Sequence, residues 1–183
     1  MPDDGCRKRS SAGAAEDTMI YELGDIFLVE GSGFVPDAIK WWSKSRYSHA
    51  MLYIGELHEQ HLVIEAGAMG VWINTLARHI EDGEGIDCYR VKAPLEYRSQ
   101  TPAAAMTYIS KRYGFEEIAG FAIALATGLR ANPFGNADSL FCSELIDLAY
   151  LGLWSNDAKT TGLVSPQTIA TSQYVQLVGR VSN

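Results

Sequence analysis

The sequence is best understood from residues 138–150, which read DSLFCSELIDLAY and have the pattern of a helix start. Asp138 and Ser139 are residue types that favour the N-cap position, because their side-chain oxygens accept from backbone N–H groups without an intrahelical partner. Apolar residues then recur at near-helical spacing. The pattern predicts a helix with Cys142 in its first turn, where the positive end of the helix dipole favours the nucleophilic thiolate.

A purely structural role explains Cys142 equally well at this point, because free cysteine is among the most frequently buried residue types. A cysteine nucleophile needs a base to take its proton and a third group to orient that base. The rest of the sequence therefore decides between the two interpretations.

Two apolar segments earlier in the chain supply candidates for the base and its orienting group. His49 lies near the start of a predicted strand at residues 47–55, and Glu65 lies inside a second one at residues 62–67. The polar turn between them predicts an antiparallel hairpin, in which the carboxylate can accept from one nitrogen of the imidazole. An unpaired buried carboxylate is costly, so Glu65 should have a partner. The alternative is that Glu65 faces solvent from an edge strand.

The other three histidines are weaker candidates for the base. His58 and His61 lie in or near the polar turn, and His79 lies in a turn or helical piece at residues 76–80, where we expect it at the surface. A lone histidine in a strand is usually structural, so the case for His49 depends on its combination with a carboxylate and a thiol.

The order of the predicted elements indicates an α+β domain with a mainly antiparallel sheet. Strand patterns come first, helix patterns follow, and a strand closes the chain. Further strands are predicted at residues 26–29, 70–73, 86–91 and 174–181, helices at 101–113 and 115–128, and short helical segments at 36–42 and from Ser165 onward. Residues 1–18 are expected to form a disordered tail, because they are rich in small, polar and charged residues, and residues 19–183 a single domain.

The composition excludes some functions. The chain of 183 residues has a net charge of −7, which gives no electrostatic footprint for nucleic-acid binding, although a local basic patch is compatible with this charge. Its three cysteines are scattered, with no CxxC pair and no zinc-like spacing with histidine. We therefore expect neither a disulfide framework nor a bound metal or other cofactor. The sequence does not predict an oligomeric state.

No segment has the pattern of a membrane span or a secretory signal. The longest apolar run, residues 118–129, is shorter than the ~20 residues that a spanning helix needs. No apolar core follows the basic residues of the N-terminal tail. We therefore expect a protein that is cytoplasmic as encoded. Such a protein would reach a substrate outside the cell only through lysis, a phage particle or a secretion machine.

Four short motifs together resemble the circularly permuted NlpC-type papain-like hydrolases of the YiiX and YaeF branch. They are GDI at residues 24–26, YSHA at 47–50, VIEA at 63–66 and FCSEL at 141–145. In ordinary papain-like enzymes the cysteine helix precedes the histidine strand. Here, as in the permuted branch, the histidine and its acidic partner come first. The resemblance covers residues 23–178.

The resemblance implies a small antiparallel sheet or open barrel packed against the helix that carries the nucleophile. It implies Cys142 as the nucleophile, His49 as the base and Glu65 as the orienting residue. The Cys142 backbone N–H would be one oxyanion donor, as its place at a helix start also indicates. Tyr113 would be a second donor or a substrate contact. The tryptophan pair at residues 41–42 would line the cleft, although core packing explains it better.

Three functions are compatible with these residues. The first is a thiol hydrolase that cleaves an amide, of the peptide or cell-wall type, through an acyl-enzyme. The second is a hydrolase or acyltransferase acting on acyl groups or lipids, similar to the lecithin:retinol acyltransferase group. Residues 118–129 would then line an acyl slot, although a packed core helix explains this segment equally well. The third is a non-catalytic binding or virion-associated domain in which Cys142 is inert.

Overall fold

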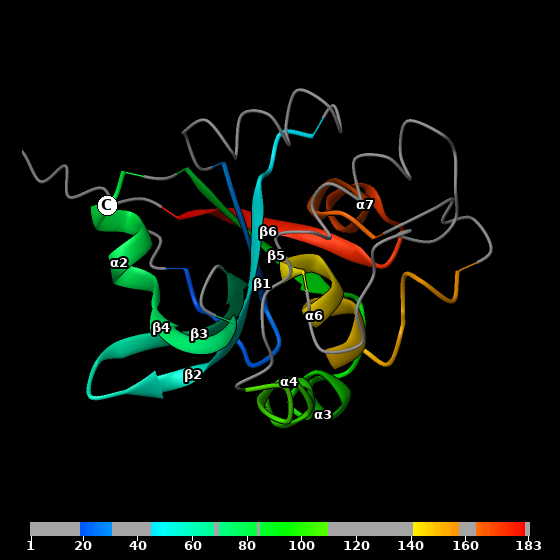
Figure 1. The fold of residues 1–183 in the computed structure, drawn as a ribbon, viewed down its shortest axis with the longest axis horizontal. Helices are drawn as coiled ribbons and strands as arrows, with labels where there is room; N and C mark the ends of the chain where they lie inside the picture. The colour runs from blue at the N-terminus through cyan, green and yellow to red at the C-terminus, as the bar shows by residue number, and fades with distance from the viewer. Residues whose placement is uncertain are drawn as a thin grey trace, which may run out of the picture.

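The computed structural model of the chain describes residues 19–30, 45–67, 70–83, 85–109, 141–157 and 164–181. Within these residues, six strands form one antiparallel sheet in the order β4-β3-β2-β1-β5-β6 (Figure 1). The strands are β1 (Ile26–Val29), β2 (His49–Leu57), β3 (Gln60–Gly67), β4 (Gly70–Thr75), β5 (Ile86–Val91) and β6 (Val175–Val181). The helices are α2 (Leu76–Glu81), α3 (Leu95–Arg98), α4 (Thr101–Met106), α6 (Cys142–Ala149) and α7 (Pro166–Thr171). None of these helices is long and apolar enough to cross a membrane.

The predicted α+β class and the antiparallel sheet are confirmed. β1 and β5 coincide with the expected strands, and β2 and β3 form the predicted hairpin. The helix expected to run to residue 113 is wrong in its length, because α4 ends at Met106. There the Thr107 hydroxyl donates to the Ala104 carbonyl (2.7 Å), which competes with helical hydrogen bonding. Three other expected segments, residues 1–18, 36–42 and 115–128, lie outside the described residues.

β1 lies inside the sheet between β2 and β5, and it is buried on both faces. All four of its side chains are fully inaccessible to solvent. Ile26 and Leu28 face the layer that contains α6, whereas Phe27 and Val29 pack in a second cluster with Leu76 of α2. This double burial explains why the strand is a continuous apolar run and does not alternate.

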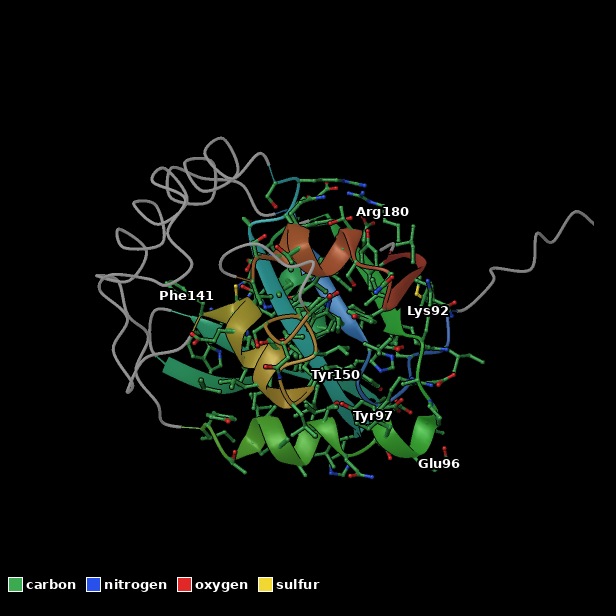
Figure 2. All side chains as sticks on the ribbon, turned by 90° about the vertical axis from the view of Figure 1, so that its right-hand side faces the viewer. Lys92, Glu96, Tyr97, Phe141, Tyr150 and Arg180 are labelled. Atoms are coloured by element: carbon green, nitrogen blue, oxygen red, sulfur yellow. The ribbon has the colours of Figure 1, made fainter. Side chains whose placement is uncertain are left out.

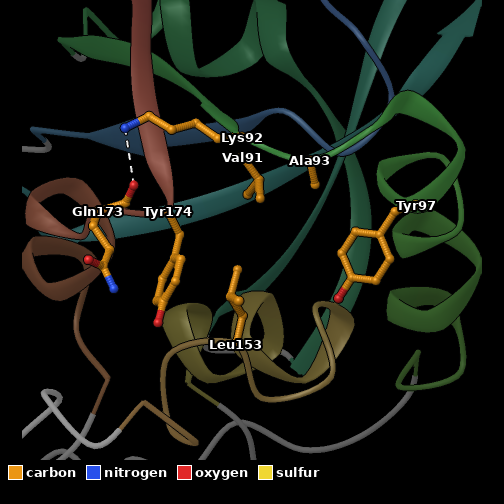
Figure 3. Close-up of a pocket in the computed structure, with 7 residues that line it drawn as sticks. All are labelled: Val91, Lys92, Ala93, Tyr97, Leu153, Gln173 and Tyr174. Carbon is orange, nitrogen blue, oxygen red and sulfur yellow. Dashed lines mark hydrogen bonds between the residues drawn. The ribbon is translucent and has the colours of Figure 1, made fainter.

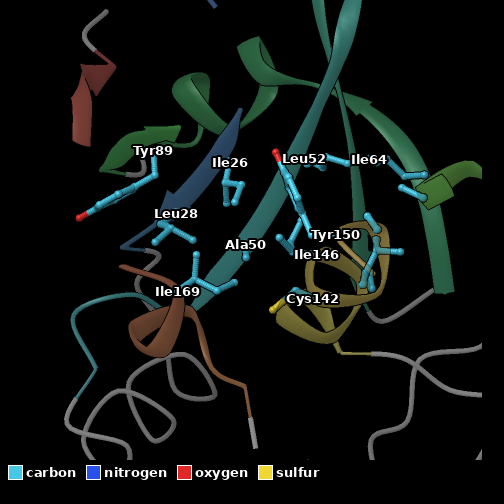
Figure 4. Packing of buried hydrophobic residues seen from close by; sticks show 14 of the residues in the cluster. Ile26, Leu28, Ala50, Leu52, Ile64, Tyr89, Cys142, Ile146, Tyr150 and Ile169 are labelled. Atoms are coloured by element: carbon cyan, nitrogen blue, oxygen red, sulfur yellow. The ribbon is translucent and has the colours of Figure 1, made fainter. Parts of the chain in front are cut away.

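α6 packs on β2 and carries Cys142 at its N-terminal end (Figure 1). Its apolar residues Leu145, Ile146 and Ala149 are buried in one cluster with Ala50 of β2 (Figure 4). Burying a Leu or Ile side chain contributes about 1.5–3 kcal/mol. Packing on the sheet, more than helix propensity, therefore stabilises this helix of eight residues.

The N-terminus of α6 differs from the prediction. Its N-cap is Phe141, in an extended conformation, and not Asp138 or Ser139. Phe141 has no side-chain acceptor, but its backbone N–H donates to the Glu144 carboxylate (3.4 Å), which is the reciprocal half of a capping box. The helix therefore begins directly at Cys142, and the prediction of a cysteine in the first turn is confirmed.

The Gly24-Asp25 pair ties β1 to α6 and β5. The Gly24 carbonyl accepts from the hydroxyl of Tyr150, the residue that ends α6 (2.6 Å). The fully buried Asp25 accepts from Nε and Nη2 of Arg90, each at 2.7 Å. The pair therefore fixes the C-terminal end of α6 on the sheet, and thereby helps to hold Cys142 at the other end in place.

The Gly24→Ala variant is expected to lose about 2–3 kcal/mol of unfolding free energy. Gly24 has a φ of +86°, and a Cβ there would lie 2.7 Å from the Arg98 carbonyl oxygen and 2.8 Å from the Tyr150 hydroxyl. Gly83 is a matched control, because its φ is +75° but nothing lies within 4 Å of an added Cβ. Gly83→Ala should cost only the left-handed strain of about 1 kcal/mol. Urea denaturation measures both losses, and equal losses would contradict tight packing around Gly24.

Candidate active site

Cys142 is the first residue of α6, and its sulfur points toward the Ala50 region of β2 (Figure 4). The residue is only 7% exposed. Backbone N–H groups of Ala50 and Ser143 donate to the sulfur. Ser143 is itself held by a hydrogen bond from its hydroxyl to the Val164 carbonyl (3.0 Å). The sulfur therefore lies among backbone donors that can stabilise a thiolate.

His49, the first residue of β2, contacts both Cys142 and Glu65. Its Nε2 is 2.6 Å from Oε2 of Glu65. The ring also hydrogen-bonds to the Cys142 side chain. Because Nε2 is engaged by the carboxylate, the contact with the thiol falls to Nδ1. The carboxylate reaches the ring because Glu65 pairs with Met51, which places it diagonally across the hairpin from His49 on the same face of the sheet.

The structure brings Cys142, His49 and Glu65 together. The alternative for Glu65, a solvent-facing position on an edge strand, is wrong, because β3 lies between β2 and β4 and Glu65 is 2% exposed. Tyr113, the fourth predicted site residue, lies outside the described residues, as does the tryptophan pair at residues 41–42.

The electrostatics of the site favour an ion pair between a thiolate and an imidazolium. Burial raises the pKa of Cys142. The charge of His49 and the hydrogen bonds to the sulfur lower it by more than burial raises it, so the net pKa is below that of an ordinary thiol. Burial lowers the pKa of His49, but the Cys142 thiolate and the Glu65 carboxylate raise it above that of an ordinary imidazole. Both shifts favour the shared proton on His49 over the same proton on Cys142.

Glu65 remains ionised because donors surround its carboxylate. Burial raises the pKa of Glu65, but hydrogen bonds from His49, His79 and Asn74 hold it well below its usual range. Nδ2 of Asn74 lies 2.9 Å from Oε1, and Nε2 of His79 lies 3.3 Å from the same oxygen. This buried negative charge offsets the positive charge of His49.

The prediction that His79 lies at the surface is wrong. Its side chain is only 14% exposed, and its ring stacks on that of His49 with centroids 6.2 Å apart. His79 faces inward because Leu76 and Ile80, three residues before it and one after, pack against the apolar cluster on this side of the sheet. The spacing of these three residues was the available signal, but a helix of six residues is too short for its pattern to define a face.

A cavity of about 400 Å³ lies apart from this cluster (Figure 3). Cys142, His49 and Glu65 do not line it; the residues that do are Val91, Lys92, Ala93, Tyr97, Leu153, Gln173 and Tyr174. Figure 2 shows Phe141, the neighbour of Cys142, on one side of the molecule and Lys92 on the other. The cavity is therefore a separate feature from the cysteine site.

The permuted order of the elements and the cluster around Cys142 are those expected of a papain-like cysteine hydrolase. A model of the permuted papain-like amidases of the YaeF/YiiX type, the C92 peptidase family, matches residues 21–178. The chain belongs to this family of cysteine amidases. The predicted resemblance, the permuted papain-like fold and the enzyme class are confirmed, and a peptide-type substrate is supported.

Among solved structures, the chain is similar to the crystal structure of the metalloprotein YiiX from Escherichia coli O157:H7. The two share 19% sequence identity and superpose with a TM-score of 0.64, over 87% of this chain and 97% of that one. At this identity the likeness shows the fold alone. No curated protein matches the sequence.

The described residues do not form a metal site. Among them, no group of three or more His, Cys, Asp or Glu side chains is arranged to hold an ion. His49 and His79 direct their Nε2 atoms at the Glu65 carboxylate, at the hydrogen-bonding distances of 2.6 and 3.3 Å. These hydrogen-bonded side chains can transfer protons and support nucleophilic attack by the thiol.

Proposed function

We propose that the protein hydrolyses an amide bond through an acyl-enzyme on Cys142, with His49 as the acid–base group and Glu65 as its orienting residue. The observation that carries this proposal is the continuous contact from the thiol through the imidazole to the carboxylate. The pKa of the thiol is lowered and that of the imidazole is raised. The nucleophile is therefore ionised before substrate binds.

Acylation begins when the Cys142 thiolate attacks the amide carbonyl carbon. A C–S bond forms, and the carbonyl electron pair moves to the oxygen. The Cys142 backbone N–H can donate to this oxyanion, because the first N–H groups of a helix have no intrahelical acceptor. His49 then gives its Nδ1 proton to the leaving nitrogen, the C–N bond breaks, and a thioester remains.

Deacylation uses the same imidazole as a base. Neutral His49 takes a proton from water through Nδ1 while the water oxygen attacks the thioester carbon. Collapse of the second tetrahedral intermediate expels the thiolate and restores the ion pair. Throughout, Glu65 accepts from the Nε2–H of His49 and so keeps Nδ1 toward the sulfur. The products are an amine and a carboxylic acid.

We further propose a peptide of the cell-wall type as the substrate, in line with the amidase activity of the family. The alternative of acyl-group or lipid chemistry depends on residues 118–129, which lie outside the described residues, so it stays a prediction. Membership in an enzyme family favours catalysis over the non-catalytic alternative.

Iodoacetamide is expected to modify Cys142 rapidly at about pH 6, where an ordinary thiol with a pKa of about 8.5 is almost fully protonated. His49→Ala should move this reactivity up into the ordinary thiol range, because the imidazolium lowers the thiol pKa. Mass spectrometry locates the label at each pH. Cys88 is an internal control, because it is fully buried and burial raises its pKa. An ordinary thiol profile at Cys142 in both proteins would overturn the proposal.

The substrate class is tested by incubating the protein with soluble cell-wall peptides and, separately, with long-chain acyl esters. Cleavage of the peptides, with new amino groups appearing in solution, is the expected result. Acylation of Cys142 by the ester but not by the peptides would instead favour the acyl-transfer alternative.

A further inference from the structure

The two oxygens of the Glu65 carboxylate have different partners. Oε2 lies 2.6 Å from Nε2 of His49, whereas Oε1 lies 2.9 Å from Nδ2 of Asn74. Nε2 of His79 lies 3.3 Å from both oxygens. One oxygen therefore serves the reacting imidazole, and the other is held by side chains that the mechanism above does not use.

Asn74 and His79 come from one structural unit, the corner where β4 ends and α2 begins. Oδ1 of Asn74 accepts from the Thr75 backbone N–H (2.9 Å), which leaves its Nδ2 directed at Glu65. Leu76, 1% exposed, anchors the first turn of α2 in the apolar cluster. One turn later, His79 reaches the same carboxylate. The corner therefore presents two N–H donors to Glu65.

We propose that His79 is a positioning residue: with Asn74 it fixes the Oε1 side of Glu65, so that Oε2 remains on Nε2 of His49. This proposal rests on the proposed function, because it acts through His49. The last torsion of a Glu side chain has a broad, roughly two-fold preference, so a carboxylate held on one side only can rotate. Donors on its second oxygen restrict that rotation and keep Nδ1 of His49 toward Cys142.

His79 suits this role as a neutral donor. Its ring stacks on His49 with an interplanar angle of 28° and centroids 6.2 Å apart. Protonation of both rings would place two positive charges beside one carboxylate, which is unfavourable at this distance. A neutral imidazole with its proton on Nε2 supplies the N–H without that repulsion. As a replacement for His79, glutamine offers an N–H group at a similar distance from Glu65, whereas phenylalanine keeps a ring but has no donor.

The test compares His79→Phe with His79→Gln in the full chain, by the rate of Cys142 alkylation with iodoacetamide between about pH 5 and 9. His79→Phe is expected to lower the alkylation rate at pH 6 about 3–10-fold. The acid limb of the curve of rate against pH should move up by about half to one pH unit. The reason is that a loosely held carboxylate stabilises the imidazolium less, and the imidazolium then stabilises the thiolate less. His79→Gln should stay within about two-fold of wild type.

A matched control separates this effect from packing. His61 lies four residues before Glu65 on β3, with Nδ1 3.0 Å from the Tyr53 hydroxyl, so His61→Phe should leave the profile unchanged. A role in packing alone would lower the unfolding midpoint without moving the profile of the folded protein. An unchanged profile in His79→Phe, or an equal shift in His79→Gln, would overturn the proposal.

If His79→Phe does not fold, Asn74→Ala carries the test, because it removes the other donor to Oε1. It should move the acid limb upward by a smaller amount, and an unmoved limb would count against the proposal. The alkylation profiles of wild type and His49→Ala distinguish failure of the proposed function from failure of the inference about His79. An ordinary thiol profile in wild type ends the proposed function, whereas a low-pH profile that depends on His49 but not on His79 ends this inference alone.

Discussion

Cys142→Ser is expected to lower the hydrolysis of a cell-wall peptide by at least about 10⁴-fold. In wild type the charge of His49 and the backbone donors of Ala50 and Ser143 lower the thiol pKa and so favour the thiolate on which the proposed mechanism depends. A serine hydroxyl has a far higher pKa, and the same surroundings cannot ionise it. The variant would therefore lose its nucleophile while keeping nearly the same shape.

The measurement counts the amino groups released from the peptide by each protein. Cys88→Ala is the control, because Cys88 is buried in the cluster on the other face of the sheet. Its activity should remain within about two-fold of wild type, since a thiol there has no part in the reaction. Thermal unfolding of all three proteins verifies the fold. A Cys142→Ser variant that keeps more than a tenth of the activity would contradict the assignment of the nucleophile.

The residues that could be predicted from the sequence are exceptions to their local pattern. Glu65 interrupts an apolar strand, and His49 stands directly before the apolar run of the neighbouring strand; a buried polar group in such a position requires a partner. Their strands are joined by a short polar turn, so antiparallel pairing alone brings them close. Cys142 stands out because its pattern places it at a helix start, where the helix dipole favours the thiolate.

The residues that could not be predicted owe their positions to tertiary packing. Asp138 and Ser139 are better N-cap types than Phe141, yet the helix begins later, where packing on β2 holds Cys142 and Glu144 supplies the cap contact. His79 was misplaced for a related reason. The direction in which it points depends on how the short α2 helix rests on the sheet, and six residues hold too little pattern to show that.

Glu65→Gln is expected to lower hydrolysis about 10²–10³-fold. The carboxylate accepts on both sides, from His49 at one oxygen and from Asn74 at the other. A glutamine amide has one oxygen, so its NH₂ group must face one of these donors. Hydrogen bonds on one side of the side chain are then lost together with the negative charge, and a buried donor without an acceptor is costly.

The pH dependence separates the effect of this charge from that of the hydrogen bonds. Glu65 raises the pKa of His49, so without the carboxylate the imidazolium is lost at lower pH and the alkaline limb of kcat/KM moves down. A less stable imidazolium also stabilises the thiolate less, so the acid limb moves up. Glu65→Asp, which keeps the charge but shortens the side chain, should lose about ten-fold with a profile nearly as wide as wild type. Glu65→Gln could instead hydrolyse the peptide slowly with a pH profile as wide as that of wild type. The charge of Glu65 would then not be acting on His49, and the role of Glu65 would depend on its hydrogen bonds alone.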